Sequence, residues 1–249
     1  MPSGARWNSY GRGSPVTLVA HGLGATEGEA RIPASGLPGT RVVLTLPSHG
    51  NAPDAPEGYW RYGTIAEDVR SVADAVGATR AVGVSLGTGA LTRIVAERPG
   101  RFERLALLLP AALDGPREVT SAWALERLAE AVAADDGGAA LRELVAAEFP
   151  PEAQVGEHVE LRVSALQRLG AALHALSDQR VLDDAGTLRA VRSEVLVIGA
   201  TEDPMHPASA ARRTAEAFPG ARLELLDSRA PMVTHRREVR ALLSGFLGG

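Results

Sequence analysis

The chain has 249 residues, of which 45% are hydrophobic and 22% charged, and its net charge is −4. This composition is typical of a globular protein with one large domain, or with a core and an inserted cap. All 26 basic residues are arginine and they form no basic block, which argues against nucleic acid as a partner. The sequence contains no cysteine, which excludes disulfides, thiolate metal sites and cysteine nucleophiles. No apolar run approaches about 18 residues and no apolar leader precedes the first strand, so we expect a cytoplasmic protein without a membrane contact.

Short β-rich runs alternate with helical patterns along most of the chain. In the first half, strands are expected over 16–20, 41–46, 80–84 and 105–109, with helices over 64–76 (Thr64 as N-cap) and 88–98. In the second half, strands are expected over 195–199 and 223–226, followed by a closing helix over 238–247. The run 105–109 is continuously apolar, as in parallel strands that are covered on both faces. The order predicts an α/β fold with a doubly wound, mostly parallel sheet.

The stretch from 113 to 185 interrupts this alternation. It favours helices over 121–134, 139–148 and 157–176 and contains no credible strand. A helical insert between two parallel strands is most simply a cap over the carboxyl ends of the strands, where ligands bind in such sheets. We therefore predict a core of residues 1–112 and 186–249 and a cap of residues 113–185. Five large apolar residues of this stretch are expected in the core of the cap: Trp123, Phe149, Leu166, Leu169 and Leu173.

Residues 83–87 read Gly-Val-Ser-Leu-Gly between a predicted strand and a predicted helix. This G-x-S-x-G pattern is typical of the nucleophile elbow, a tight turn that exposes a serine hydroxyl. Glycine is needed at Gly83 and Gly87 because a Cβ at either position would strike the neighbouring strand or helix. In that turn the Leu86 N–H points toward the place where an oxyanion would form.

Several further motifs resemble those of the α/β-hydrolase superfamily, over nearly the whole chain. The segment 21–24 (His-Gly-Leu-Gly) stands where that family carries its oxyanion loop, and 47–50 (Pro-Ser-His-Gly) is similar to the turn after the next strand. Helix residues Thr64 and Asp68 also fit the family pattern. The segment 198–207 (Ile-Gly-Ala-Thr-Glu-Asp-Pro-Met-His-Pro) resembles the one that bears the acid of the catalytic triad, and 217–223 matches the crossing that follows.

The resemblance implies a catalytic site. Ser85 would be the nucleophile, Asp203 the orienting acid, and the N–H groups of Leu23 and Leu86 the oxyanion donors. A serine hydroxyl needs an imidazole to take its proton, and a carboxylate must hold that imidazole in one tautomer. Glu202 and Asp114 are alternative acids in this interpretation.

The catalytic histidine is predicted to be His235, which adjoins the closing helix. The family position lies nearer Ser228 and Arg229, so the alternative is that Arg229 occupies it and the triad is incomplete. His206 is only three residues from Asp203 and is expected at the rim or in solvent. Structural roles are expected for the other histidines: His21 beneath the oxyanion turn, His49 in the next turn, and His158 and His174 on helix surfaces.

No metal-ligand spacing and no dinucleotide fingerprint is present, so neither a metal nor a cofactor is expected. A serine at the elbow, instead of an aspartate, argues against haloalkane and epoxide chemistry. The sequence favours a serine hydrolase that cleaves a small acyl ester, thioester or lactone through an acyl-enzyme on Ser85. Two alternatives stay open: C–C cleavage, elimination or cyclisation on the same fold, and a small-molecule-binding protein without catalysis.

Overall fold

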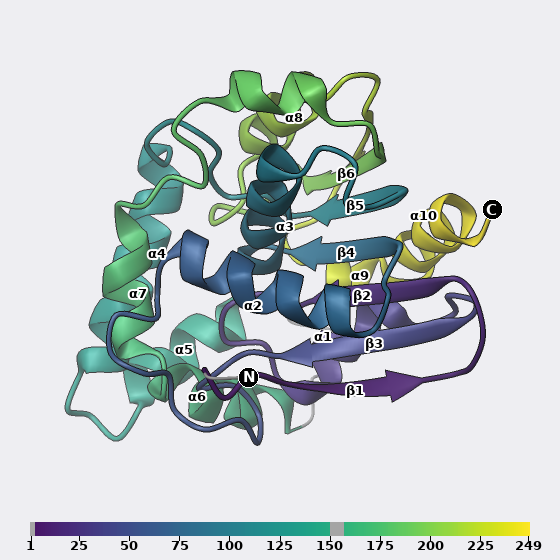
Figure 1. The fold of residues 1–249 in the computed structure, drawn as a ribbon. Helices are drawn as coiled ribbons and strands as arrows, with labels where there is room; N and C mark the ends of the chain where they lie inside the picture. Colours follow the sequence, from purple (N-terminus) through teal and green to yellow (C-terminus); the bar gives the residue numbers. More distant parts are fainter. Residues whose placement is uncertain (1–2, 150–156) are drawn as a thin grey trace.

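A seven-stranded sheet crosses the centre of the molecule in the order β1-β3-β2-β4-β5-β6-β7 (Figure 1). The structure is a computed structural model and describes residues 3–149 and 157–249. β1 is antiparallel to β3, and all other strand pairs are parallel, which confirms the predicted fold class. The strands are β1 (Arg6–Tyr10), β2 (Val16–Ala20), β3 (Thr40–Thr45), β4 (Arg80–Val84), β5 (Arg104–Leu108), β6 (Glu194–Ala200) and β7 (Arg222–Leu226).

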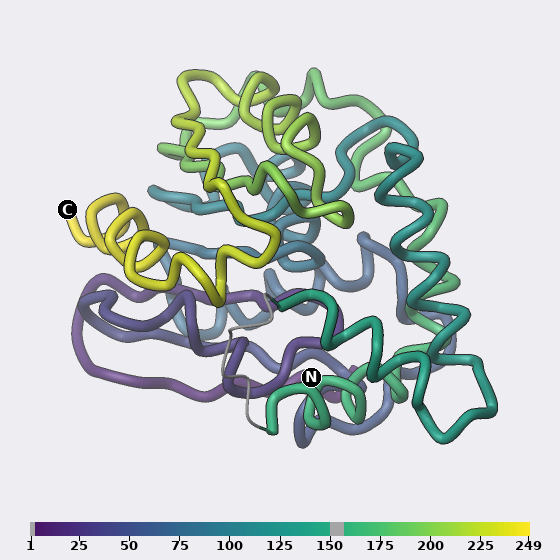
Figure 2. Tube along the Cα trace, turned by 180° about the vertical axis from the view of Figure 1, so that it is seen from behind, coloured from purple at the N-terminus to yellow at the C-terminus, as the bar shows by residue number. Residues whose placement is uncertain are grey.

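Helices cover both faces of the sheet. On one face lie α2 (Tyr62–Ala75), α3 (Leu86–Glu97) and α8 (Ala208–Ala217); on the other lie α1 (Glu27–Arg31) and α10 (Arg236–Gly248), which crosses the front of the view in Figure 2. Neighbouring strand residues face opposite layers: Leu18 packs in the first and Val19 in the second. Because both faces are covered, both sets of side chains are apolar, and this explains the continuous apolar strands. Short helical segments complete this part: η1 (Ile32–Ala34), η2 (Ala185–Ala190) and α9 (Pro231–Thr234).

A helical insert lies between β5 and β6. It comprises α4 (Val119–Ala133), α5 (Ala139–Ala147), α6 (His158–Gln167) and α7 (Gly170–Ser177). Figure 1 shows α4 and α7 on the side toward which β4 and β5 point. The insert has its own apolar core, and its two connections to the sheet lie side by side, because the Val181 and Leu182 N–H groups donate to the Leu113 carbonyl. The bounds 113 and 185 stay a prediction. No helix in the described part of the chain is long and apolar enough to cross a bilayer.

Some local expectations were wrong. α2 begins at Tyr62, two residues before the expected cap Thr64, and no side chain caps it. The expected helix 157–176 is two helices, α6 and α7, that join at 168–169. Trp123, expected in the core, is 66% exposed on α4. Leu166, Leu169 and Leu173 are fully buried as expected, and Phe149 is half-buried.

Candidate active site

Ser85 lies on a sharp turn between β4 and α3. Its backbone angles are φ 48° and ψ −105°, a conformation that L-residues rarely adopt. A Cβ on Gly83 would lie 2.6 Å from the Thr88 nitrogen, and one on Gly87 would lie 2.1 Å from the Ala20 oxygen. The expected reason for both glycines is therefore confirmed. The Ser85 N–H donates to the Leu108 carbonyl at 2.9 Å, which fixes the turn on β5.

The Ser85 hydroxyl forms a hydrogen bond to His206, whose Nε2 lies 2.8 Å from Oγ. The other ring nitrogen, Nδ1, lies 2.7 Å from Oδ2 of Asp203. With the proton on Nδ1, the ring donates to the carboxylate and Nε2 accepts from the hydroxyl. The His206 and Asp203 side chains are 14% and 12% exposed, so the three groups lie largely out of water.

A short, rigid loop after β6 brings the acid and the histidine together. Oδ1 of Asp203 accepts the N–H groups of Met205 and His206 at 2.9 and 3.2 Å, which turns the chain back on itself. Pro204 and Pro207 restrict the loop on both sides. Burial alone would raise the pKa of Asp203, but the His206 ring and the two N–H donors lower it below its usual value. The expectation that His206 is a solvent-exposed or rim residue, too near Asp203 for a triad, was wrong because this turn lays the ring across the carboxylate.

The structure does not bring His235 to Ser85. Its Nδ1 forms a hydrogen bond to Thr234 Oγ1 at 2.8 Å, and its ring is not among the side chains that line the cavity at Ser85. Arg229 does line that cavity, but it is exposed, and its contact is with the Ala147 carbonyl at 3.5 Å. The histidine at the serine thus comes from the loop of the acid and not from the segment before α10. The signal for it in the sequence was Asp203-Pro-Met-His206-Pro.

Two backbone N–H groups beside Ser85 have no hydrogen-bond acceptor among the described residues: those of Leu23 and Leu86. Leu86 is the first residue of α3, where N–H groups have no partner within the helix. Leu23 follows Gly22, at which a Cβ would lie 3.4 Å from Ser85 Cβ. Both leucines line the cavity. This geometry suits the predicted oxyanion role of the two N–H groups.

Two buried histidines, whose ring planes are inclined at 54°, lie beneath the oxyanion loop and accept hydrogen bonds from its backbone and the next turn. The His21 and His49 rings lie 4.5 Å apart. Gly24 N–H donates to His49 Nε2 at 2.9 Å, and Leu46 N–H donates to His21 Nε2 at 3.1 Å. Because Nε2 accepts in both rings, both are neutral, with the proton on Nδ1. Burial lowers the pKa of each ring. Their expected structural roles are confirmed.

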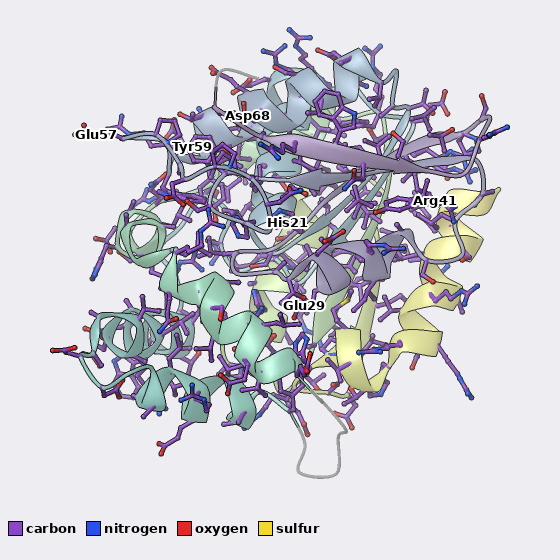
Figure 3. The ribbon with its side chains drawn as sticks, turned by 90° about the horizontal axis from the view of Figure 1, so that it is seen from below. His21, Glu29, Arg41, Glu57, Tyr59 and Asp68 are labelled. Atoms are coloured by element: carbon purple, nitrogen blue, oxygen red, sulfur yellow. The ribbon has the colours of Figure 1, made fainter. Side chains whose placement is uncertain are left out.

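Arg162 of α6 joins the helical insert to the oxyanion loop. Its guanidinium donates to the Gly24 carbonyl at 3.3 Å, to Glu29 Oε1 at 3.4 Å and to Glu148 Oε2 at 3.1 Å. Figure 3 shows Glu29 on the side of α1 that faces the insert. Burial would raise the pKa of Glu29, but the nearby His158 ring and the Arg162 charge lower it to about 2. No local pattern in the sequence indicates the contacts of Arg162 with Gly24, Glu29 and Glu148.

The triad opens into a cavity of about 1080 Å³ between the sheet and the insert. Most of its lining is apolar, which suits an organic molecule of modest size. The alternative acids lie elsewhere: Asp114 pairs with Arg213 at 3.2 Å, and Glu202 is exposed. Within residues 3–149 and 157–249, no group of three or more histidine, aspartate or glutamate side chains is arranged to hold a metal ion.

Comparisons with known proteins agree with this fold. Residues 12–242 match the Alpha/beta hydrolase family. A hydrolase from Pseudomonas aeruginosa is 26% identical, with a TM-score of 0.76 over 98% of this chain and 94% of that one. The enol-lactonase from Burkholderia xenovorans (22% identity, TM-score 0.78) and an esterase from Exiguobacterium antarcticum (18%, 0.79) each align over 98% of this chain and 96% of their own. These two are similar in fold. A comparison with curated proteins gave no match.

Proposed function

The chain belongs to the α/β-hydrolase family, and from this premise we propose that it is a serine hydrolase that cleaves a small acyl ester, thioester or lactone through an acyl-enzyme on Ser85. The observation that carries the proposal is the pair of hydrogen bonds that joins Ser85 to His206 and His206 to Asp203. Neighbours that are described as an enol-lactonase and an esterase support the bond type.

Each residue has a defined role in this reaction. His206 Nε2 takes the proton of Ser85 as Oγ attacks the carbonyl, and then gives that proton to the leaving oxygen or sulfur. Asp203 holds the ring in the tautomer with the proton on Nδ1 and stabilises the imidazolium that forms. The Leu23 and Leu86 N–H groups donate to the oxyanion of each tetrahedral intermediate. Water, activated by His206, then attacks the acyl-enzyme and releases the acid.

A displaced or missing base would favour the alternatives, which are C–C cleavage, elimination or cyclisation, and small-molecule binding without catalysis. His206 supplies an imidazole at 2.8 Å from the serine, so this reason no longer applies.

Turnover of p-nitrophenyl acetate and butyrate tests the proposal. Ser85→Ala should lower kcat by about 10³-fold or more, because the nucleophile is lost while the oxyanion donors remain. A fluorophosphonate probe should label the wild type and not the variant. If the variant kept the wild-type kcat, Ser85 would have no part in the reaction and the proposal would be wrong.

A further inference from the structure

Arg117 lies in the cavity between the sheet and the helical insert, and its charge has no counter-ion among the described residues. It belongs to the connection between β5 and α4 and lines the same cavity as Ser85 and His206. Its Nε is fully buried and has no hydrogen-bond partner among the described residues. Within residues 3–149 and 157–249, no carboxylate forms an ion pair with its guanidinium. A half-buried guanidinium without a counter-ion carries a desolvation cost, so its place in a cavity points to an anionic ligand.

The guanidinium faces Tyr62, a buried residue at the start of α2. Burial raises the pKa of the Tyr62 hydroxyl, and the Arg117 charge opposes part of that rise. The Tyr62 ring in turn packs on α3, because a Cβ on Gly89 would lie 2.3 Å from its Cε1. Gly89 is one helical turn after Ser85, and its N–H donates to the Ser85 carbonyl. Through Tyr62, Arg117 therefore lies near the first turn of α3, the helix that follows the nucleophile.

Arg117 differs from the other charged groups of the cavity, which either have an ion-pair partner or are exposed. Glu29 and Glu148 are held by Arg162, and Asp203 by His206. The remaining charged residues of the cavity that have no ion pair among the described residues are all exposed: Glu27, Arg127, Glu157, Arg229 and Arg236. Arg117 is half-buried, and among the described residues of this cavity it is the charged side chain that is partly shielded from water and has no ion pair.

We propose that Arg117 binds a carboxylate on the acyl part of the substrate, a few carbons from the carbonyl that Ser85 attacks. This inference rests on the proposed hydrolase function and names its substrate class: half-esters or half-thioesters of dicarboxylic acids, or lactones of hydroxy-dicarboxylic acids. The planar guanidinium matches a carboxylate with two parallel hydrogen bonds. The acyl part is the one that stays on Ser85 when the ester bond breaks, so the group that recognises it must share the cavity of the nucleophile, and Arg117 lines that cavity.

Two matched esters test the inference: mono-p-nitrophenyl adipate and its methyl ester, p-nitrophenyl methyl adipate. The four methylenes of adipate keep attack of its own carboxylate on the ester slow. The wild type should prefer the charged ester in kcat/KM. Arg117→Met should lower this preference by about 10- to 100-fold, Arg117→Lys should lower it less, and Arg212→Met, at an exposed arginine of α8, should leave it unchanged. Because Arg117 has no ion-pair partner among the described residues and its contact with Tyr62 is to a neutral hydroxyl, Arg117→Met should change the thermal midpoint little.

A wild type without this preference, or an Arg117→Met variant that keeps it, would overturn the inference. Loss of several degrees in the midpoint of both Arg117 variants would do so too, since it would show a structural role. A binding experiment distinguishes failure of this inference from failure of the proposed function. If neither ester is cleaved, calorimetry measures the binding of adipate to Ser85→Ala and to Ser85→Ala/Arg117→Met. Weaker binding in the double variant supports the carboxylate site and rejects hydrolysis, whereas equal binding or no binding rejects the site.

Discussion

His206 and His235 are the two histidines that follow Asp203, and only His206 contacts Ser85. Replacing each by alanine separates their roles. His206→Ala should lower kcat on a p-nitrophenyl ester by about 10³-fold or more, because the serine loses the group that takes its proton. His235→Ala should change kcat less than about twofold, because its ring bonds to Thr234 and does not line the cavity at Ser85. The measurement is kcat and KM for both variants beside the wild type.

The reverse result would be equally informative. If His235→Ala abolished turnover and His206→Ala did not, the segment 227–235 would have to move over the elbow in solution, and His206 would be a structural partner of Asp203. Circular dichroism of both variants excludes misfolding as the cause of a loss.

Arg162 connects two elements, α6 of the insert and the loop that carries Leu23. Arg162→Met should lower kcat by about tenfold. The Gly24 carbonyl loses its donor, and the N–H of the preceding residue, Leu23, is then less well placed for the oxyanion. The same variant leaves Glu29 and Glu148 without their cation, so the free energy of unfolding should fall by about 1–3 kcal/mol. The readouts are kcat against KM and urea denaturation.

Arg142→Met is the matched control for that variant. Arg142 pairs with Glu160 between α5 and α6, but on the exposed side of the insert. Its loss should leave both kcat and the unfolding midpoint unchanged. An Arg162→Met variant that unfolds more easily but keeps the wild-type kcat would show that the contact stabilises the insert without positioning the loop.

The elements were predictable where burial sets the pattern. Strands β2 and β4 were predicted to the residue, and the other predicted strands to within one residue at each end, because their apolar runs are bounded by polar residues and turns. β1 was missed because its edge position leaves mostly exposed side chains, so no apolar run marks it. The break between α6 and α7 was missed because Gly170 lies within an otherwise helical composition.

The site was predictable where it depends on local turns. Gly83, Ser85 and Gly87 follow from one tight bend, and Asp203 from the resemblance of its segment to the one that bears the acid. The sequence Asp203-Pro-Met-His206-Pro places His206 next to the acid, but its contact with Ser85 depends on the hydrogen bonds by which Asp203 folds the loop back, and these are not visible in the sequence. The contact between Glu29 and Arg162 joins residues 133 positions apart, and no local pattern encodes it.

At the scale of the whole molecule, the neutral histidines His21 and His49 make stability depend on pH. Burial lowers the pKa of both below the ordinary 6.5. Below pH 6.5 the unfolded chain therefore binds protons that the native state does not, so stability is complete above pH 6.5 and is lost as pH falls. The slope is at most about 1.4 kcal/mol per pH unit for each histidine. Glu29, whose pKa is lowered to about 2, adds a further loss only below pH 4.5.

Urea denaturation at pH 8, 7, 6 and 5 measures this dependence in the window where the two histidines act and Glu29 does not. The free energy of unfolding should be flat from pH 8 to 7 and should fall from pH 6 to 5. His49→Gln should be less stable at every pH, because Gly24 loses its acceptor, but its slope between pH 6 and 5 should be smaller than that of the wild type. His174→Gln, at an exposed position of α7, should keep the wild-type slope. Equal slopes in all three proteins would mean that other groups set the pH dependence, and that protonation of this buried pair does not limit the stability of the loop beneath Ser85.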